Sequence, residues 1–291
     1  MTFWIQSSLN GLSTGAIYGL IAAGFSLTYL TTAKFNFGLG LWVMLGAMLT
    51  YTFVVDLAVF PLLALLLVVL ATFALGWVAE LVSVRPFKNT DNDLWIVSTL
   101  AIGLLLVDLA QLIWGKYPLT VEDYFGAESI YIGDVAIRTQ HLLNIFAVIL
   151  VFVFLHLFFS RTLRGMAFRA VAADRTTAEL MGVNSRRVEQ VAFAAAAALA
   201  GVAGFMIVPI TGADANIGTA LGFKGFAVAI VGGLAAPRGV LLIGLLYGFL
   251  EAMISAYLFA GIRDIVGFSL MILALYFLPF GILGQPERRL R

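Results

Sequence analysis

The stretch that decides the fold is Ser160–Glu189, which reads SRTLRGMAFRAVAADRTTAELMGVNSRRVE. It carries six arginines and three acids, and it is the only long, strongly basic interruption in the second half of an otherwise apolar chain. A short loop this basic between apolar spans lies on the cytoplasmic side of a membrane. The stretch therefore predicts both the class of protein and the direction in which its helices cross the bilayer.

The composition of the whole chain is that of a membrane protein. Its 291 residues are 62% hydrophobic and only 11% charged, whereas a soluble globular protein carries about 25% charged residues. Because a helix needs roughly 20 apolar residues to cross a bilayer, we expect no sizeable soluble domain but a single transmembrane domain over residues 1–291. The chain has no cysteine, which excludes disulfides, thiolate metal sites and cysteine nucleophiles.

Nine apolar runs predict an all-α integral membrane protein with about eight or nine transmembrane helices, one or two of them broken or short. The seventh run is too short to cross as a regular helix and is rich in glycine, so we expect it to be broken, tilted or re-entrant. The entry to the second run, Phe35–Leu41, has the same character. The runs are Leu9–Leu30, Leu39–Val55, Pro61–Val82, Leu94–Trp114, Leu142–Phe159, Val188–Ile210, Phe223–Leu234, Val240–Leu258 and Ile265–Phe280.

The positions of the lysines and arginines predict the direction in which these runs cross the membrane. Of the 17 lysines and arginines, 13 fall in regions that we place inside, and three (Lys116, Arg138 and Arg263) fall in outside loops. Lys224 lies within the seventh run. This bias predicts a multi-pass protein of the cell (inner) membrane with its N-terminus outside and its C-terminus in the cytoplasm. The regions placed inside are 31–36, 83–93, 160–187, 237–239 and 285–291.

The longest external loop, 115–141, alternates in polarity over Ser129–Ile137, which predicts a small β-hairpin. Its acids serve either as ordinary solvated surface or as a contact for another protein, and both interpretations stay open. These acids are Glu122, Asp123, Glu128 and Asp134.

Glycines recur at spacings that let two helices approach closely in lipid. Packing within the chain and a dimeric or moving interface both account for such a pattern. The spaced glycines are Gly11, Gly15 and Gly19, Gly201 and Gly204, and Gly244 and Gly248.

The basic loop has the local signals of one short helix with defined ends. Asp174 suits the N-cap of a helix over Arg175–Met181, because its carboxylate meets free N–H groups and the positive end of the helix dipole. Gly182 falls where a left-handed C′ residue is expected, with Val183 as the apolar residue after it. Arg175 and Glu179 stand four residues apart and can form an ion pair.

The apolar surface of this helix is made of small or flexible side chains, with the arginines facing away from it. We expect Ala170, Val171, Ala178 and Met181 to form that surface. It suits a groove on a protein, whereas the arginines suit anionic lipid. The residues alone leave docking and lipid contact equally open.

Ionisable groups at membrane depth are costly and tend toward function. Asp108 and Glu251 are the two candidates, and Glu251 serves either as a buried hydrogen-bonding group or in the pathway. We expect His156 to be bonded locally and Lys224 to snorkel or to pair with an acid such as Asp214.

Polar or irregular positions near the second and fourth runs are candidates for contact with a transported molecule. Asn36 and Gly38 lie in the glycine-rich entry, where backbone groups are free to bind a zwitterion or an amide. Ser98 and Thr99 are adjacent hydroxyls early in the fourth run. The alternative is ordinary helix packing, since Ser and Thr readily bond to their own helix carbonyls.

Three blocks of this sequence resemble the permeases of branched-chain amino acid ABC transporters, of the LivH type. They are the loop Arg161–Asn184, the N-terminal span Leu9–Gly24, and Ala229–Leu234 followed by the Pro237–Gly239 turn and a glycine-rich span that ends in Glu251. Members of that family tend to read Asn-Phe-Ala-His-Gly after the first span, where this chain has NFGLG at 36–40.

The resemblance implies that loop 160–187 contains the coupling helix, which inserts into a groove on an ATP-hydrolysing subunit. Ala178 and Gly182 look like the reduced form of the alanine–glycine motif of importer permeases. The coupling residues so implied are Arg169, Asp174, Arg175, Ala178, Glu179, Met181 and Gly182.

The implied function is that of a permease subunit in an ATP-dependent importer of branched-chain or related amino acids, in the lipid bilayer. The resemblance implies two cytoplasmic ATP-binding subunits, a second permease subunit, identical or related, and an extracytoplasmic binding protein. The chain has no phosphate-binding Gly-x-x-x-x-Gly-Lys-[Ser/Thr] loop, so we expect it to be no enzyme and to bind no cofactor, with ATP and Mg on its partners. We expect no nucleic-acid partner.

Other transport classes remain as alternatives. Relatives of the same type import urea, short amides or small organic acids. An ion-coupled secondary transporter would carry more acids within the membrane and inverted repeats. A membrane enzyme would cluster His, Asp or Glu near one face, and this chain has two histidines far apart.

Overall fold

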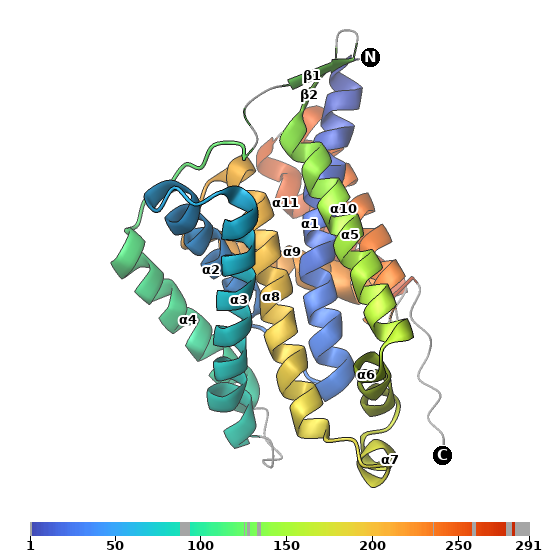
Figure 1. Cartoon of the computed structure of the whole chain (residues 1–291). Coiled ribbons are helices and arrows are strands. Elements are labelled where there is room, and N and C mark those ends of the chain that lie inside the picture. Colours follow the sequence, from blue (N-terminus) through green and yellow to red (C-terminus); the bar gives the residue numbers. More distant parts are fainter. Residues whose placement is uncertain are drawn as a thin grey trace.

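The computed structural model describes residues 2–87, 94–124, 126, 129–132, 135–234, 236–257, 260–277 and 281–282. Over these residues the chain is a helical bundle with one β-hairpin (Figure 1), as the sequence predicts. Its helices are α1 (Thr2–Thr32), α2 (Leu39–Tyr51), α3 (Pro61–Ala79), α4 (Leu94–Trp114), α5 (Thr139–Arg161), α6 (Leu163–Ala173), α7 (Arg175–Leu180), α8 (Ser185–Thr211), α9 (Ile217–Gly232), α10 (Pro237–Tyr257) and α11 (Arg263–Phe277).

Every predicted apolar run is helical over its described residues, except for Gly233 and Leu234 at the end of the seventh. In that part of the chain, seven helices are long and apolar enough to cross a membrane. They are α1, α2, α3, α4, α5, α8 and α10, with α2 and α3 lengthened by π-helical turns at Thr52–Asp56 and Glu80–Val84. The remaining two runs form the shorter helices α9 and α11. The all-α membrane class is thus confirmed, with seven candidate spans in the described residues where the sequence predicts about eight or nine.

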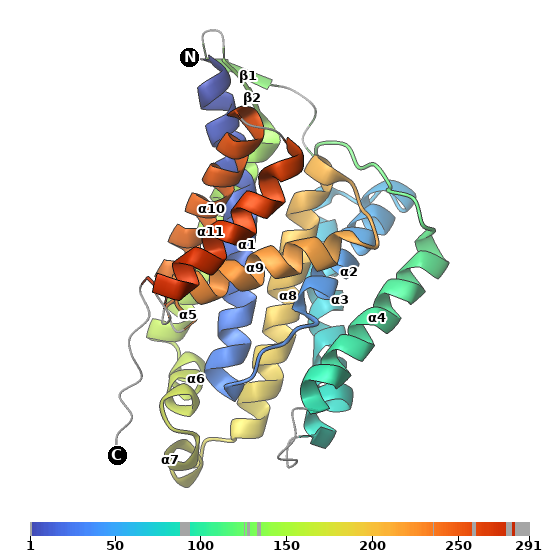
Figure 2. The same ribbon diagram turned by 180° about the vertical axis from the view of Figure 1, so that it is seen from behind.

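Helix α9 selects one of the three alternatives expected for the seventh run, because it is continuous and steeply inclined rather than broken (Figure 2). It begins at Ile217, six residues before the predicted start, and has 16 residues, so it is about 24 Å long and shorter than the hydrocarbon core of about 30 Å. Figure 2 shows it crossing α1 and α8 at a steep angle. Its glycines do not interrupt it, and the helix ends at Gly233, whose φ is +90°.

Helix α1 is the centre of the bundle and is almost wholly buried. It packs against α10 through glycines on both helices: a Cβ atom added to Gly15 would lie 2.5 Å from the carbonyl oxygen of Gly244. Gly11 meets Gly248 in the same way. These contacts confirm packing within the chain as the reason for the glycine spacing on α1.

Helices α2 and α8 form a second close pair in the core. A Cβ atom on Gly46 would lie 2.6 Å from the Gly201 backbone, and one on Gly204 would lie 2.3 Å from the Val43 carbonyl. By contrast α3, α4 and α5 expose most of their surface. The fold is therefore a tight inner group of helices with a looser outer layer, which leaves large apolar faces exposed.

The two ends of the bundle differ. Strands β1 (Ser129–Ile132) and β2 (Val135–Arg138) form the predicted antiparallel hairpin at one end, where the N-terminus also lies (Figure 1). The Gln6 side chain donates a hydrogen bond to the Ala136 carbonyl at 3.0 Å. Helices α6 and α7 lie at the opposite end. This arrangement agrees with the prediction that the N-terminus and the longest external loop share one side of the membrane.

The segment before the hairpin is held to the bundle. Asp123 forms an ion pair with Arg138 at 3.1 Å, and the Tyr124 hydroxyl donates to the Phe205 carbonyl while its ring stacks on Phe205. Glu122 is exposed. The other two acids of this loop, at 128 and 134, lie outside the described residues.

The α1–α10 contact predicts how two similar substitutions differ. Gly15→Ala should destabilise the protein by about 1–3 kcal/mol, because its methyl group overlaps the α10 backbone. Gly19→Ala on the same face should change stability by less than about 0.5 kcal/mol, because its nearest neighbour, the Leu241 Cα atom, is 3.4 Å away. Thermal unfolding of the detergent-solubilised variants measures both, and equal melting temperatures would contradict the role given to this contact.

Candidate functional site

The basic loop forms two helices, not the single one expected from the sequence. Helix α6 follows α5 after a sharp turn at Thr162, whose hydroxyl accepts a hydrogen bond from the Gly165 N–H at 2.9 Å. A Cβ atom on Gly165 would lie 2.1 Å from the Phe158 carbonyl, so only glycine fits there. The Phe168 ring then packs edge-on against two rings of α5. These contacts order α6, which the sequence analysis did not predict.

Helix α7 has the ends that the sequence predicts. The Asp174 carboxylate accepts from the N–H groups of Thr176 and Thr177 at 2.9 and 3.2 Å and from the Thr177 hydroxyl at 2.6 Å. At the other end Gly182 has a φ of +86°, and its N–H bonds to the Glu179 carbonyl while the next N–H bonds to the Ala178 carbonyl. This pair of bonds is a Schellman motif.

Hydrogen bonds stabilise the ionised form of Asp174, the N-cap residue of α7. The Thr177 hydroxyl and the backbone N–H groups of Thr177 and Thr176 hold the pKa of Asp174 below its ordinary value. A carboxyl group whose pKa is lowered by folding stabilises the folded state at neutral pH, and this contribution is lost only as the pH falls through the lowered pKa. The cap therefore stays ionised at neutral pH.

Charged side chains fasten α7 to the start of α8. Arg175 pairs with Glu179, as predicted, and also with Glu189 of α8, both at 3.1 Å. The Ser185 hydroxyl donates to Glu179. Asn184 caps α8 by accepting from the Arg187 N–H at 3.1 Å. Helix α7 is thus tied at both ends and across its side.

The apolar surface of the loop is divided differently from the prediction. Val171 and Ala178 are buried within the loop, whereas Ala170 is exposed and Met181 is 81% exposed. Leu180, which the sequence analysis did not single out, is 83% exposed beside Met181. Ala170 and Val171 belong to α6, whereas Ala178 and Met181 belong to α7 and its C-cap, so the four residues do not form one helix face. The exposed apolar group lies at the C-terminal tip of α7.

Six of the seven predicted coupling residues lie together on α7 and its two caps. Arg169 is the exception, because it belongs to α6. It lines a cavity of about 300 Å³ beside Leu30 and Thr31 of α1.

The glycine-rich entry to α2 is irregular, as predicted. Ala33 has a φ of +52°, and α2 begins only at Leu39. The rings of Phe35 and Phe37 both pack against Phe226 of α9, with centroids 5.3 and 5.4 Å apart. An aromatic cluster thus holds this entry in place.

Three of the four predicted substrate positions near this entry come together. Asn36, Gly38 and Thr99 line a cavity of about 10 Å³, which is room for about one water molecule. Ser98 does not line it, because adjacent residues of a helix face different directions. A Cβ atom on Gly38 would lie 2.8 Å from the Thr99 carbonyl oxygen. The arrangement is a closed constriction.

Local bonds occupy the polar groups of this constriction. Asn36 Oδ1 accepts from the Gly38 N–H at 3.1 Å, and the Thr99 hydroxyl donates to the Ile96 carbonyl at 2.9 Å. A transported molecule would have to displace or share these bonds.

Glu251 stands in an ion cluster away from that cavity, and of its four members Glu251 and Lys224 are buried. Its carboxylate contacts Lys224 and lies 3.0 Å from Arg263 Nε. Lys224 also lies 2.9 Å from Asp264. Lys224 therefore pairs with acids, which was one of the two expectations for it. Asp214, named as one possible partner, instead bonds to the nearby Asn216 N–H. The cluster joins α9, α10 and α11, a tertiary contact that no local pattern shows.

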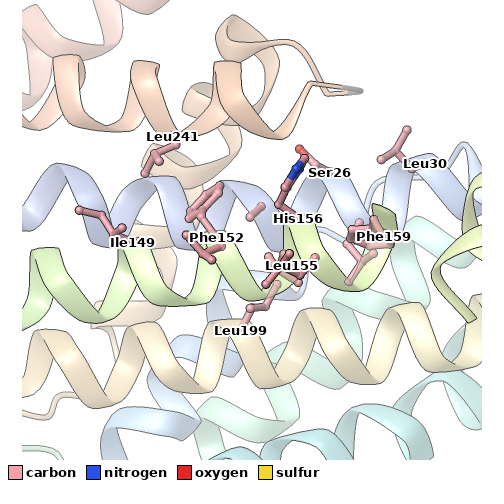
Figure 3. Close-up of a pocket in the computed structure, with 13 residues that line it drawn as sticks. Ser26, Leu30, Ile149, Phe152, Leu155, His156, Phe159, Leu199 and Leu241 are labelled. Carbon is pink, nitrogen blue, oxygen red and sulfur yellow. The ribbon is translucent and has the colours of Figure 1, made fainter. Parts of the chain in front are cut away.

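The remaining ionisable candidates have separate surroundings. Asp108 is exposed on α4. His156 forms no hydrogen bond in the described part of the chain, contrary to expectation, and with Ser26 it lines a cavity of about 360 Å³ that is otherwise apolar (Figure 3). Sequence reasoning missed Glu80, which is buried at the start of the π-helical turn after α3. An acid inside the third apolar run was the signal available for it.

The ion cluster predicts a coupled response to mutation. Lys224→Met should destabilise the fold by about 3 kcal/mol, because it removes one partner of a buried pair. The double variant Lys224→Met/Glu251→Leu should lose less than the sum of the single losses, with a coupling energy of about 1–3 kcal/mol. Melting of the four proteins completes the cycle, with exposed Lys116→Met as the control. Strictly additive losses would show that the pair is not coupled.

The chain is similar to known membrane transport proteins over nearly its whole length. A family described as "Branched-chain amino acid transport system / permease component" matches residues 7–275. The chain is 31% identical over 299 residues to the high-affinity branched-chain amino acid transport system permease protein LivH of Escherichia coli, covering 98% of this chain and 97% of LivH. It is 31% identical over 297 residues to the permease BraD of Pseudomonas aeruginosa, with the same coverage.

One further relative and one solved structure are also similar to the chain, the structure in its fold. A probable branched-chain amino acid transport permease protein LivH of Methanocaldococcus jannaschii is 29% identical over 294 residues, covering 94% of this chain and 90% of that protein. PsaBC from Streptococcus pneumoniae, solved in complex with a Fab, shares the fold with a TM-score of 0.51 at 12% identity, over 91% of this chain and 90% of the other. The chain thus belongs to the permease family of branched-chain amino acid transport systems.

Proposed function

We propose that this chain is the membrane-spanning subunit of an ATP-dependent importer for branched-chain or related amino acids. Family membership supports the transport role. The observation that carries the mechanism is α7, a short helix capped at both ends that presents Leu180 and Met181 at the end of the bundle opposite the hairpin. In this proposal α7 is the coupling helix and that end is cytoplasmic, as is the C-terminus, with the protein in the inner membrane.

The partners follow from what the chain contains. It has no phosphate-binding loop, so ATP and Mg would be held by two cytoplasmic subunits that grip α7. The exposed apolar faces of α3 and α4 leave area for a second permease subunit. The hairpin within the loop 115–141, formed by β1 and β2, faces an extracytoplasmic binding protein. The chain itself would perform no catalysis and would bind no cofactor.

In this proposal α7 and its caps, residues 174–182, act as a rigid lever that transmits force from the ATP-binding subunits to the membrane helices. The cap at Asp174, the Schellman motif at Gly182 and the Arg175–Glu189 pair keep α7 rigid relative to α8. Because α8 is embedded in the core whereas α5 is mostly exposed, a displacement of the loop moves α5 against a fixed inner group. This motion would open the pathway alternately to each side.

We place the substrate pathway beside the entry to α2. The cavity lined by Asn36, Gly38 and Thr99 is nearly closed, as expected for a gate at rest. Irregular backbone at membrane depth occurs where it is buried in protein or lines a wet cavity. Ser98 and Glu251 lie outside this cavity, and we assign Glu251 to the ion cluster that anchors α9.

The lever predicts that Gly182→Val lowers uptake and substrate-stimulated ATP hydrolysis about five- to thirtyfold, because a side chain at positive φ costs about 1–2 kcal/mol. Gly115→Val is a matched control. Gly115 also has a positive φ, +89°, and neither glycine has an atom within 4 Å of an added Cβ, but Gly115 follows α4 at the other end of the chain's spans.

Both variants are assayed in the assembled transporter at equal membrane abundance. Loss of coupling in Gly182→Val together with normal uptake in Gly115→Val is the expected result. Normal transport by the Gly182 variant, or an equal loss in both, would count against α7 as the lever.

The pathway predicts a difference between two neighbouring hydroxyls. Thr99→Val should raise the KM for uptake about fivefold, because it removes a polar group from the cavity wall at constant shape. Ser98→Ala should leave the KM unchanged. Uptake of labelled leucine and of labelled urea, measured in parallel, also separates the amino-acid assignment from its alternative. An unchanged KM in Thr99→Val would remove this cavity from the pathway.

A further inference from the structure

A basic groove lies between α5, α6 and α8, close to the sharp turn into α6. It has a volume of about 660 Å³. Its floor is apolar and aromatic, with Phe154 and Phe158 of α5 and Val191 of α8 among the lining residues. Arg164 of α6 and Arg187 of α8 line it as well. A large apolar groove with two cations on it is unlike an ordinary packing defect.

The two arginines carry charge that the described part of the chain does not neutralise. Neither Arg164 nor Arg187 forms an ion pair with an acid there, and both are exposed. Arg175 of the same loop differs, because it pairs with two glutamates. The groove therefore offers an anion two guanidinium groups, which bind phosphate oxygens well.

The groove adjoins a second apolar cavity along α5. The cavity of about 360 Å³ in Figure 3 shares Leu27, Leu155 and Phe159 with the basic groove. It continues along α5 to Ile149, about 15 Å from Phe159 at 1.5 Å per residue. The combined space is elongated, apolar along its length and cationic at one end, which is the shape and polarity of a phospholipid.

We propose that the basic groove binds an anionic phospholipid, with its phosphate on Arg164 and Arg187 and an acyl chain along α5. Anionic headgroups concentrate at the cytoplasmic surface, where basic residues near the membrane attract them. A free phosphate ion would use the arginines but leave the aromatic floor empty. A soluble partner protein would not reach the cavity between α1 and α5, which lies among the membrane-spanning helices.

A lipid bound in the basic groove would contact the base of the loop that carries α6 and α7. It would fill the space between α5 and α8 at the base of α6, where α5 has few other neighbours within the chain. The inference does not require that the chain imports amino acids, because lipid binding is measured on the purified permease alone.

The experiment is a lipid competition followed by native mass spectrometry. The purified chain is equilibrated with equal amounts of palmitoyl-oleoyl phosphatidylglycerol and phosphatidylcholine, and the bound lipid is counted. We expect a preference for the anionic lipid of about 25-fold, since each basic side chain near an anionic surface contributes about fivefold. The double variant Arg164→Gln/Arg187→Gln should lose this preference.

The matched control is Arg161→Gln/Arg186→Gln, which removes the same charge from neighbouring positions that do not line the groove. It should keep the preference. A second variant, Ala195→Phe, fills the groove while leaving its arginines in place, and it should lower the binding of both lipids. The melting temperature of the Ala195→Phe variant is measured to check that it folds.

Three outcomes would overturn the proposal: equal binding of the two lipids, equal loss in the control pair, or displacement of the lipid by millimolar inorganic phosphate, which would indicate a free-anion site. Lipid retention unchanged by Ala195→Phe would likewise place the lipid elsewhere.

Discussion

Backbone contact between helices at glycine is the constraint on which the rest of this structure depends. In lipid, no hydrophobic driving force brings apolar helices together. Van der Waals packing must drive their association, and it is strongest where the backbones touch. Gly15 and Gly244 on α1 and α10, and Gly46 and Gly201 on α2 and α8, allow that approach. Helices α3 and α4 also approach the inner group at glycines, Gly76 and Gly103. Helix α5 contains no glycine, and the cavities of about 360 and 660 Å³ lie beside it.

This difference in packing gives the basic loop two unequal attachments. At its C-terminal side the loop runs into α8, which is buried from Val188 to Pro209 with few exceptions. At its N-terminal side it leaves α5, which has cavities along its length. A rigid segment between a fixed and a loosely held helix transmits a push to the loose one. The caps of α7 serve this function by keeping the segment rigid, and so does the ion pair between Arg175 and Glu189.

The sequence predicted the features that short stretches specify by themselves. Asp174 and Gly182 mark the ends of α7 because caps are local, and the alternation at 129–137 marks the hairpin for the same reason. Contacts between distant segments were not accessible. The sequence offered an acid as a partner of Lys224 but not its identity, because Glu251 and Asp264 lie on other helices. Helix α6 was missed because rings of α5 order it. The roles of the substrate and coupling residues remain predictions, since geometry places them but does not test them.

The ion cluster explains why α9 can be short and steeply inclined. A helix of about 24 Å that lies across the bundle is too short for its position to be set by the thickness of the bilayer. Its glycines pack closely against α1 and α2, but they carry no side chains that would fix its register. Burying Lys224 alone would be very costly, so α9 is stable only where Glu251 and Asp264 stand opposite that lysine. A buried pair of this kind adds little net stability but penalises every other register of α9 against α10. Because α9 also supplies Phe226 to the aromatic cluster at the entry to α2, fixing its register fixes the wall beside Asn36. The buried charges thus position the entry, although none of them lines its cavity.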